Sequence, residues 1–168
     1  WTLYDKRVQY QTFDVTDLLR SGRNAVGAVV GNGWWSGRIN WRTPPAGVRN
    51  VLRFVCELDV ELSSGERVVV ATDDTWRAHE SPVVSDDLYD GETHDARLAL
   101  PGWDRPGFDD RDWEPTATIA DEVGRLVAQR GPSIRCTHTF SPIAVTEPSP
   151  GVFVFDFGQN LAGRERLK

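Results

Sequence analysis

The sequence predicts an all-β fold, an antiparallel β-sandwich, and three observations support this prediction. First, apolar and polar residues alternate over residues 52–62, which is typical of a long strand buried on one face. Second, several short strand-like runs are separated by turns rich in Gly, Pro, Asp and Asn. Third, no helical periodicity of useful length occurs in the 168 residues. Short strands without helices are the pattern of two packed antiparallel sheets.

Composition narrows the class of protein. Hydrophobic residues make up 39% of the chain, which is enough for a packed core. No apolar run approaches the roughly 20 residues that span a bilayer, so no membrane segment is expected. The net charge of −6 argues against a nucleic-acid surface, which needs clustered cations. The chain has no methionine, even at position 1, which indicates a piece of a longer chain. A signal peptide and the cellular location therefore stay unknown.

The first part of the chain predicts a strand, a turn and a second strand. Residues 4–10 alternate weakly and predict a strand. Residues 14–24 predict one helical turn or a tight loop that Gly22 closes in the left-handed conformation. Residues 25–30 form a short apolar run, which predicts a strand buried on both sides.

The middle of the chain predicts hairpins. The long strand over 52–62 is followed by a turn and by its antiparallel partner over 67–72. Residues 75–80 alternate again and predict another strand. Residues 81–92 are polar and lose periodicity, so they predict a second long loop, after which 93–100 re-enters the sheet.

The last third predicts a surface segment, a short helix and a new domain. Aromatic residues are expected to pin residues 101–113 to the sandwich, and 119–127 predicts a short helix. Beyond a Gly-Pro boundary, residues 134–140 and 152–157 read as strands, and residues 148–151 (PSPG) before the second strand predict a turn that ends at Gly151. The predicted domains are residues 1–131 and residues 132–168.

Cysteines and histidines indicate no metal site. Cys56 and Cys136 each occupy an apolar position of a strand-like run, so buried free thiols are expected, with a disulfide as the alternative. They are too far apart for a zinc knuckle, and the three histidines lack the spacing of metal ligands. The adjacent aspartates at 73–74, 86–87 and 109–110 are expected to form turns rather than to bind calcium.

Residues 31–41 stand out from the strand pattern. They hold three of the seven tryptophans, three glycines, two asparagines and one arginine, which is typical of a loop. Flat aromatic rings can cover the C–H faces of a sugar while amide and guanidinium donors reach its hydroxyls. The alternative is that the tryptophans plug the end of the sandwich or pack against neighbouring domains.

Four motifs then occur in a characteristic order: residues 7–16 (RVQYQTFDVT), 31–35 (GNGWW), 89–97 (YDGETHDAR) and 156–160 (DFGQN). This series resembles the N-terminal region of bacterial α-L-rhamnosidases, family 78 of the glycoside hydrolases. The resemblance implies a jelly-roll, galactose-binding-domain-like module that lacks leading strands, followed by the first strands of a second β-sandwich. It also implies that the catalytic acid and base belong to an (α/α)₆ barrel further along the chain.

The resemblance implies a non-catalytic fragment of a glycoside hydrolase that cleaves terminal α-L-rhamnosides. Its expected partners are a rhamnose-containing carbohydrate and the remaining domains of the same chain. Because the jelly-roll module of some relatives binds L-rhamnose with calcium, calcium is a candidate cofactor at an unassigned position. Two alternatives stay open: a purely structural β-sandwich that supports the barrel, and the sugar-binding domain of another glycosidase.

The candidate ligand-binding residues lie in two loops that are expected to meet at one end of the sandwich. A tryptophan would stack on the ring, the amide and the guanidinium would donate to hydroxyls, and a carboxylate would accept from them or hold calcium. Glu92 and Asp95 point to opposite faces of an extended strand, so they do not form a catalytic pair; Glu92 is expected to hold its loop, and Asp95 to pair with Arg97 or a backbone amide. The candidates are Asn32, Trp34, Trp35, Arg38, Tyr89, Asp90 and Glu92.

Overall fold

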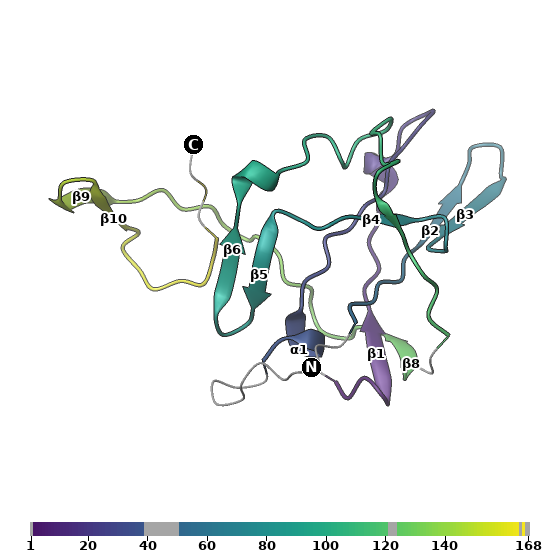
Figure 1. Ribbon diagram of the computed structural model, residues 1–168, viewed down its shortest axis with the longest axis horizontal. Helices are drawn as coiled ribbons and strands as arrows, with labels where there is room; N and C mark the ends of the chain where they lie inside the picture. Colours follow the sequence, from purple (N-terminus) through teal and green to yellow (C-terminus); the bar gives the residue numbers. More distant parts are fainter. Residues whose placement is uncertain (1, 39–50, 121–123, 165, 167–168) are drawn as a thin grey trace. The chain divides into compact units, whose positions relative to one another are not determined.

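The computed structural model describes residues 2–38, 51–120, 124–164 and 166 (Figure 1). The chain divides into two compact units, Trp1–Ala128 and Gln129–Lys168, which are described separately. The predicted domain boundary between residues 131 and 132 stays a prediction.

Short strands dominate the regular secondary structure of the described residues, which confirms the all-β prediction. No helix among them is long and apolar enough to cross a membrane. The helical elements are η1 (Thr16–Leu18), α1 (Gly33–Ser36) and η2 (Ala96–Leu98). The strands are β1 (Arg7–Tyr10), β2 (Glu57–Glu61), β3 (Arg67–Ala71), β4 (Arg77–Ala78), β5 (Val83–Asp87), β6 (Gly91–His94), β7 (Glu114–Pro115), β8 (Arg125–Ala128), β9 (Ala144–Ser149) and β10 (Val152–Asp156).

The predicted turn over residues 14–24 is confirmed. Asp14 Oδ1 accepts a hydrogen bond from Thr16 N at 3.0 Å, just where η1 begins. Gly22 has φ +92°, the left-handed conformation that glycine adopts without a steric penalty. The buried strand predicted over residues 25–30 is wrong, because these residues form no strand and Val29 is 66% exposed. No described strand pairs with them, and an apolar run without a ladder partner cannot become a buried strand.

The hairpin β2–β3 confirms the antiparallel pairing predicted for the middle of the chain. Leu58 pairs with Val70 across the hairpin, and the exposed Asp59 side chain accepts a hydrogen bond from Arg67. The first strand is shorter than predicted, because strand pairing starts at Glu57. The partner strand β3 ends at Ala71 and a turn follows at 73–76, so residues 52–55 are not part of this hairpin.

The strands β4 and β7 pair antiparallel over two residues each, so the strand predicted over 75–80 is mostly absent. Thr116 N, just beyond β7, donates to Trp76 O at 3.0 Å, so Pro115 opposite Arg77 interrupts no ladder bond to β4. The aromatic contacts predicted for residues 101–113 are confirmed. Trp113 lies 5.5 Å from Phe108 and 5.6 Å from His79, measured between ring centroids.

The strands β1 and β8 run side by side and parallel, which is an exception to the antiparallel prediction (Figure 1). The helix predicted over residues 119–127 is wrong from Arg125 onward, because the strand β8 begins there. Residues 121–123 of the predicted helix lie outside the described residues. Gly124 explains the difference. Its N–H donates to Tyr4 O at 3.0 Å, and a Cβ there would lie 2.4 Å from Arg7 N, so only glycine allows this backbone approach.

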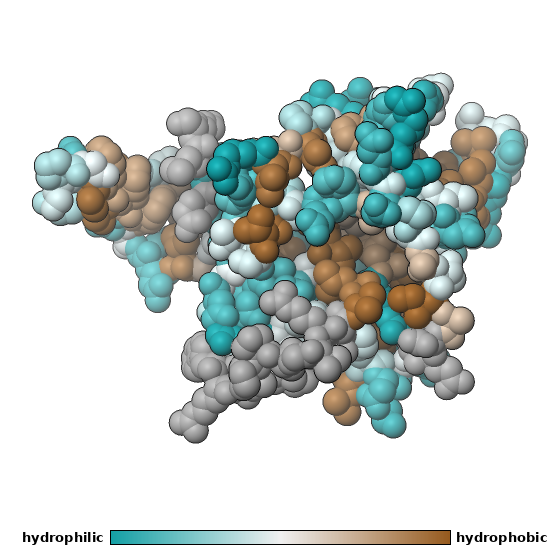
Figure 2. Space-filling model, viewed as in Figure 1, coloured by the Kyte–Doolittle hydropathy of each residue, from teal (hydrophilic) through white to brown (hydrophobic). Residues whose placement is uncertain are grey.

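The described residues do not form the packed core that the composition predicted, since none of them is fully buried. Their strands pair only in twos, so each pair leaves apolar side chains partly in water. Val69 of β3, for example, is 50% exposed. Figure 2 shows such apolar residues at the surface among hydrophilic ones.

The second unit contains one antiparallel hairpin, β9–β10, as predicted for residues 152–157 and the turn before them. Gly151 turns the chain at φ +79°, and its N–H donates to Glu147 Oε1 at 2.8 Å. Residues 134–140 form no strand, which corrects the prediction. Both cysteines are free, but Cys136 is exposed rather than buried, because the strand that would have buried it does not form; Cys56 is half-buried.

Candidate functional site

The polar segment 81–92, predicted as a long loop, is the hairpin of β5 and β6. Asp87 Oδ1 accepts from Tyr89 N at 2.8 Å, and Gly91 has φ +81°. Both are usual in tight turns, where Asp accepts from the backbone two residues on and Gly adopts positive φ. Strand pairing ends at His94, and Asp95 then caps η2 through Arg97 N at 3.0 Å. The Asp95 carboxylate also pairs with the Arg97 guanidinium, which confirms the role predicted for Asp95.

The predicted loop 31–41 contains a four-residue helix, α1, preceded by Asn32 and followed by Gly37. Gly33 has φ +49°, and Gly37 N donates to Gly33 O at 3.2 Å to close the turn. Residues 39–41 of this loop lie outside the described residues. So do residues 44–47, whose sequence PPAG predicts a turn or a further extension of the loop.

Asp86 holds the segment just before α1. Asn32 N donates to Asp86 Oδ2 at 2.8 Å, and Asn32 Nδ2 donates to Asp86 Oδ1 at 2.9 Å. The same Nδ2 also donates to the backbone oxygen of Asp86 at 2.8 Å. Both residues are half-buried, and together they join positions 54 residues apart in the sequence.

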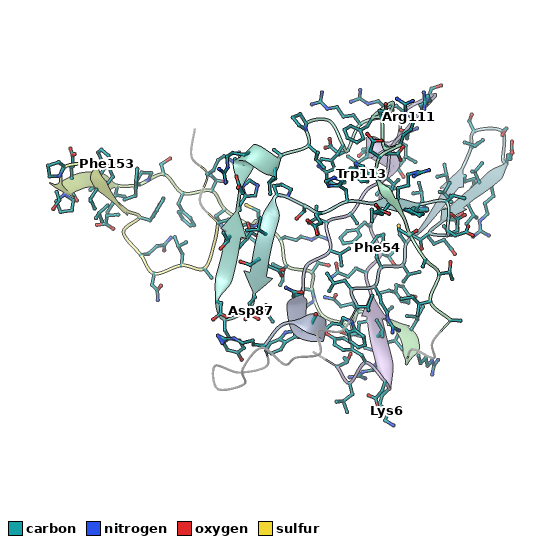
Figure 3. All side chains as sticks on the ribbon, in the orientation of Figure 1. Lys6, Phe54, Asp87, Arg111, Trp113 and Phe153 are labelled. Atoms are coloured by element: carbon teal, nitrogen blue, oxygen red, sulfur yellow. The ribbon has the colours of Figure 1, made fainter. Side chains whose placement is uncertain are left out.

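Asp87 holds the segment just after α1. Arg38 N donates to Asp87 Oδ2 at 2.7 Å, while Tyr89 N occupies the other carboxylate oxygen. These two backbone N–H groups, with Arg38 the stronger influence, hold the pKa of the Asp87 carboxyl below its usual value. Figure 3 shows Asp87 at the end of β5, next to α1.

Glycines allow the carboxylates to come this close. A Cβ on Gly31 would lie 2.9 Å from Asp86 Oδ2, and a Cβ on Gly37 would lie 3.1 Å from Asp87 Oδ2 and 2.5 Å from Gly33 O. Both distances to the carboxylates are tighter than ordinary Cβ contacts. Gly31 before α1 and Gly37 after it therefore leave room for the carboxylates of Asp86 and Asp87.

Arg38 also binds the turn of the hairpin through its side chain. Its Nη2 lies 2.6 Å from Asp90 Oδ1, with the Arg38 side chain 24% exposed and that of Asp90 55% exposed. Arg38 Nε is buried and has no hydrogen-bond partner among the described residues.

The two tryptophans of α1 contact different groups. The Trp34 ring meets Tyr89 edge-on, with centroids 6.2 Å apart. The Trp35 ring instead meets Tyr4, with ring centroids 5.5 Å apart, and the Arg53 guanidinium lies over it, 5.5 Å from its centroid. Trp35 Nε1 also donates to the backbone oxygen of Val51. Trp34 therefore faces the hairpin, whereas Trp35 is held by other parts of the chain.

The structure thus connects five of the seven predicted site residues with the Asp86–Asp87 pair or with one another, and two are outside this connected set. Trp35 is one. Glu92 is the other: it is exposed in β6, opposite Asp86 in register, and its carboxylate has no hydrogen-bond partner in the part of the chain that is described. The connected residues are Asn32, Trp34, Arg38, Tyr89 and Asp90.

Sequence reasoning missed the Asp86–Asp87 pair as the centre of this cluster, because adjacent aspartates more often form turns. The only signal was the glycine spacing at residues 31 and 37, which predicts close approach but not the approaching group. Within the described residues, no group of three or more His, Cys, Asp or Glu side chains is placed to hold a metal ion. The structure therefore assigns no residue to the candidate calcium.

A family model described as the α-L-rhamnosidase N-terminal domain matches residues 1–138. The chain belongs to this family. α-L-Rhamnosidases are glycoside hydrolases, so the chain is part of a glycoside hydrolase family, as the motifs predicted. The chain is 44% identical to an α-L-rhamnosidase of Streptomyces avermitilis over 170 residues, covering 100% of this chain and 16% of the relative. It is 33% identical to one from Formosa agariphila, covering 98% of this chain and 18% of the relative.

Solved structures agree. The crystal structure of the Streptomyces avermitilis α-L-rhamnosidase complexed with L-rhamnose matches with a TM-score of 0.78 and 39% identity, covering 96% of this chain and 16% of that one. The α-L-rhamnosidase from Dictyoglumus thermophilum matches with a TM-score of 0.76 and 33% identity, covering 94% and 17%. These matches confirm the all-β, sandwich-like class. The chain spans 16–18% of the length of the curated relatives that it matches.

Proposed function

We propose that this chain is a non-catalytic N-terminal part of an enzyme that hydrolyses terminal α-L-rhamnosides. The family and the names of its relatives support the activity of the whole protein. The state of the carboxylates supports the non-catalytic role. A general acid needs a raised pKa, whereas hydrogen bonds from Arg38 and Arg97 hold the pKa values of Asp87 and Asp95 below the usual value.

We further propose that α1 and the β5–β6 turn bind a rhamnose-containing carbohydrate. The observation that carries this proposal is that the Arg38 guanidinium and the Trp34 ring meet the same β5–β6 turn, at Asp90 and Tyr89. Asp90 holds the guanidinium through Nη2, and because the Arg38 side chain is 24% exposed, a guanidinium N–H can donate to a sugar hydroxyl. Trp34, edge-on to Tyr89, supplies aromatic surface on the same short helix. The exposed carboxylates of Asp90 and Glu92 can accept from further hydroxyls or take part in binding calcium.

A structural role is the second candidate, and the bonds of Asn32 favour it. Its amide donates to two acceptors on Asp86, so the side chain already serves the contact between α1 and the hairpin. In this case the cluster stiffens the module and supports the remaining domains of the same chain.

Calorimetric titration of the full-length protein with L-rhamnose, with and without calcium, separates the two roles. A sugar site here adds one binding event to that of the catalytic domain, and R38A removes it. R67A is the matched control, because Arg67 pairs with Asp59 on the separate β2–β3 hairpin. A stoichiometry that is the same in wild type and R38A, at saturating sugar, excludes the binding role and leaves the structural one.

A further inference from the structure

The two carboxylates that hold α1 are neighbours in the sequence. Side chains of successive strand residues normally point to opposite faces. Asp86 and Asp87 are the last two residues of β5, and they reach opposite ends of α1, at Asn32 and Arg38. One short stretch of hairpin therefore fixes both ends of the helix that carries Trp34.

Each carboxylate uses both of its oxygens. Asp86 accepts from the backbone N–H and from the side-chain amide of Asn32. Asp87 accepts from the backbone N–H groups of Arg38 and Tyr89. An amide in place of either carboxylate would offer only one acceptor, and alanine would offer none.

Asp87 also ties α1 to the groups that face it. Tyr89, whose backbone it holds, carries the ring that meets Trp34, and the next residue, Asp90, binds the Arg38 guanidinium. The positions of the Trp34 ring and of the Arg38 side chain therefore both depend on this carboxylate.

We propose that Asp86 and Asp87 are positioning residues, which hold Trp34 and Arg38 in the arrangement that binds carbohydrate without touching the sugar themselves. This inference rests on the carbohydrate-binding function proposed above. Removing either carboxylate releases one end of α1, so ligand affinity falls although every side chain that faces the ligand is still present.

The test uses the full-length protein, L-rhamnose as the probe, and two variant series, D86N and D86A with D87N and D87A. D59N is the control for loss of an acidic side chain, since Asp59 lies on β2 and pairs with Arg67. Affinity at the module site is measured by calorimetry, backbone exchange of residues 31–38 by hydrogen–deuterium exchange, and global stability by the melting temperature. The alanine variants are expected to weaken binding about tenfold or more, the asparagine variants less, and D59N not at all.

The outcomes separate the two proposals. A wild-type protein that shows only the catalytic binding event overturns the proposed function itself. A wild-type protein with the second event, and alanine variants that bind as tightly as it does, overturns the positioning role. If an alanine variant melts early, its asparagine partner decides: weaker binding and faster exchange at 31–38 with an unchanged melting temperature support positioning, and unchanged binding contradicts it.

Discussion

Replacing Gly31 with alanine tests the fit between α1 and the hairpin most sharply. The new Cβ would lie 2.9 Å from Asp86 Oδ2, a separation that real Cβ atoms essentially never show. The backbone of Gly31 does not need positive φ, so alanine brings no conformational penalty of its own. The carboxylate oxygen must therefore move away, and this oxygen accepts from Asn32 N at 2.8 Å.

The expected cost follows from that one bond. A hydrogen bond to a charged acceptor contributes about 1.5–3 kcal/mol, and half-burial of Asp86 places it at the lower end, about 1.5 kcal/mol. Local opening of α1 then becomes about tenfold more frequent. Hydrogen–deuterium exchange of peptides that cover residues 31–38 in the full-length protein measures this directly. Gly131→Ala is the control, because a Cβ there meets nothing within 4 Å.

A double-mutant cycle completes the test. In a D86S background the oxygen that meets the new Cβ is gone, so Gly31→Ala should add nothing to the exchange rate. If Gly31→Ala leaves exchange at wild-type rates, or if its effect persists undiminished in D86S, the proposed contact does not govern this segment.

Three further predictions concern the same framework. Gly37→Ala should also speed exchange, but D87S should not relieve it, because the closest atom to the new Cβ is the backbone oxygen of Gly33, at 2.5 Å; full relief by D87S would contradict this. Because the folded-state pKa of Asp87 is lowered, its contribution is present above the ordinary carboxyl pKa near 3.9 and is lost as pH falls through the lowered value. After correction for intrinsic rates, exchange at residues 31–38 of the wild-type protein should therefore be faster below about pH 4 than above it. The D87A variant should show no such difference. Gly124→Ala should destabilise the β1–β8 pair by about 3 kcal/mol, since its Cβ would lie 2.4 Å from the backbone of Arg7; a change in melting temperature no larger than that of Gly131→Ala would refute this.

Local chemistry made some elements predictable. The alternation around Leu58 specified the β2–β3 hairpin, and Gly22 and Gly151 marked turns that the structure places in the left-handed region. These signals depend on a few neighbouring residues, so a single sequence contains them.

Other elements depended on partners that are distant in the sequence. The helix predicted near residue 125 is a strand because β1, more than 100 residues earlier, lies beside it. The run at 25–30 has the composition of a buried strand but no ladder partner among the described strands. Propensity and periodicity cannot reveal whether such a partner is present.

The candidate site shows the same division. Asn32, Trp34 and Arg38 were predictable from their residue types, and Asp90 and Tyr89 from the second motif. The polar residues of β5 looked like a loop, because a strand whose carboxylates bind another segment lacks apolar alternation. Asp86 and Asp87 could be recognised only once the hairpin and α1 were seen together.

A crystal structure of the full-length protein with L-rhamnose tests the central claim most directly. A sugar hydroxyl is expected within about 3.2 Å of a guanidinium nitrogen of Arg38, with α1 still bonded to Asp86 and Asp87. Density for rhamnose in the catalytic domain alone, with no sugar at the Arg38 guanidinium at saturating sugar, would contradict the proposed site.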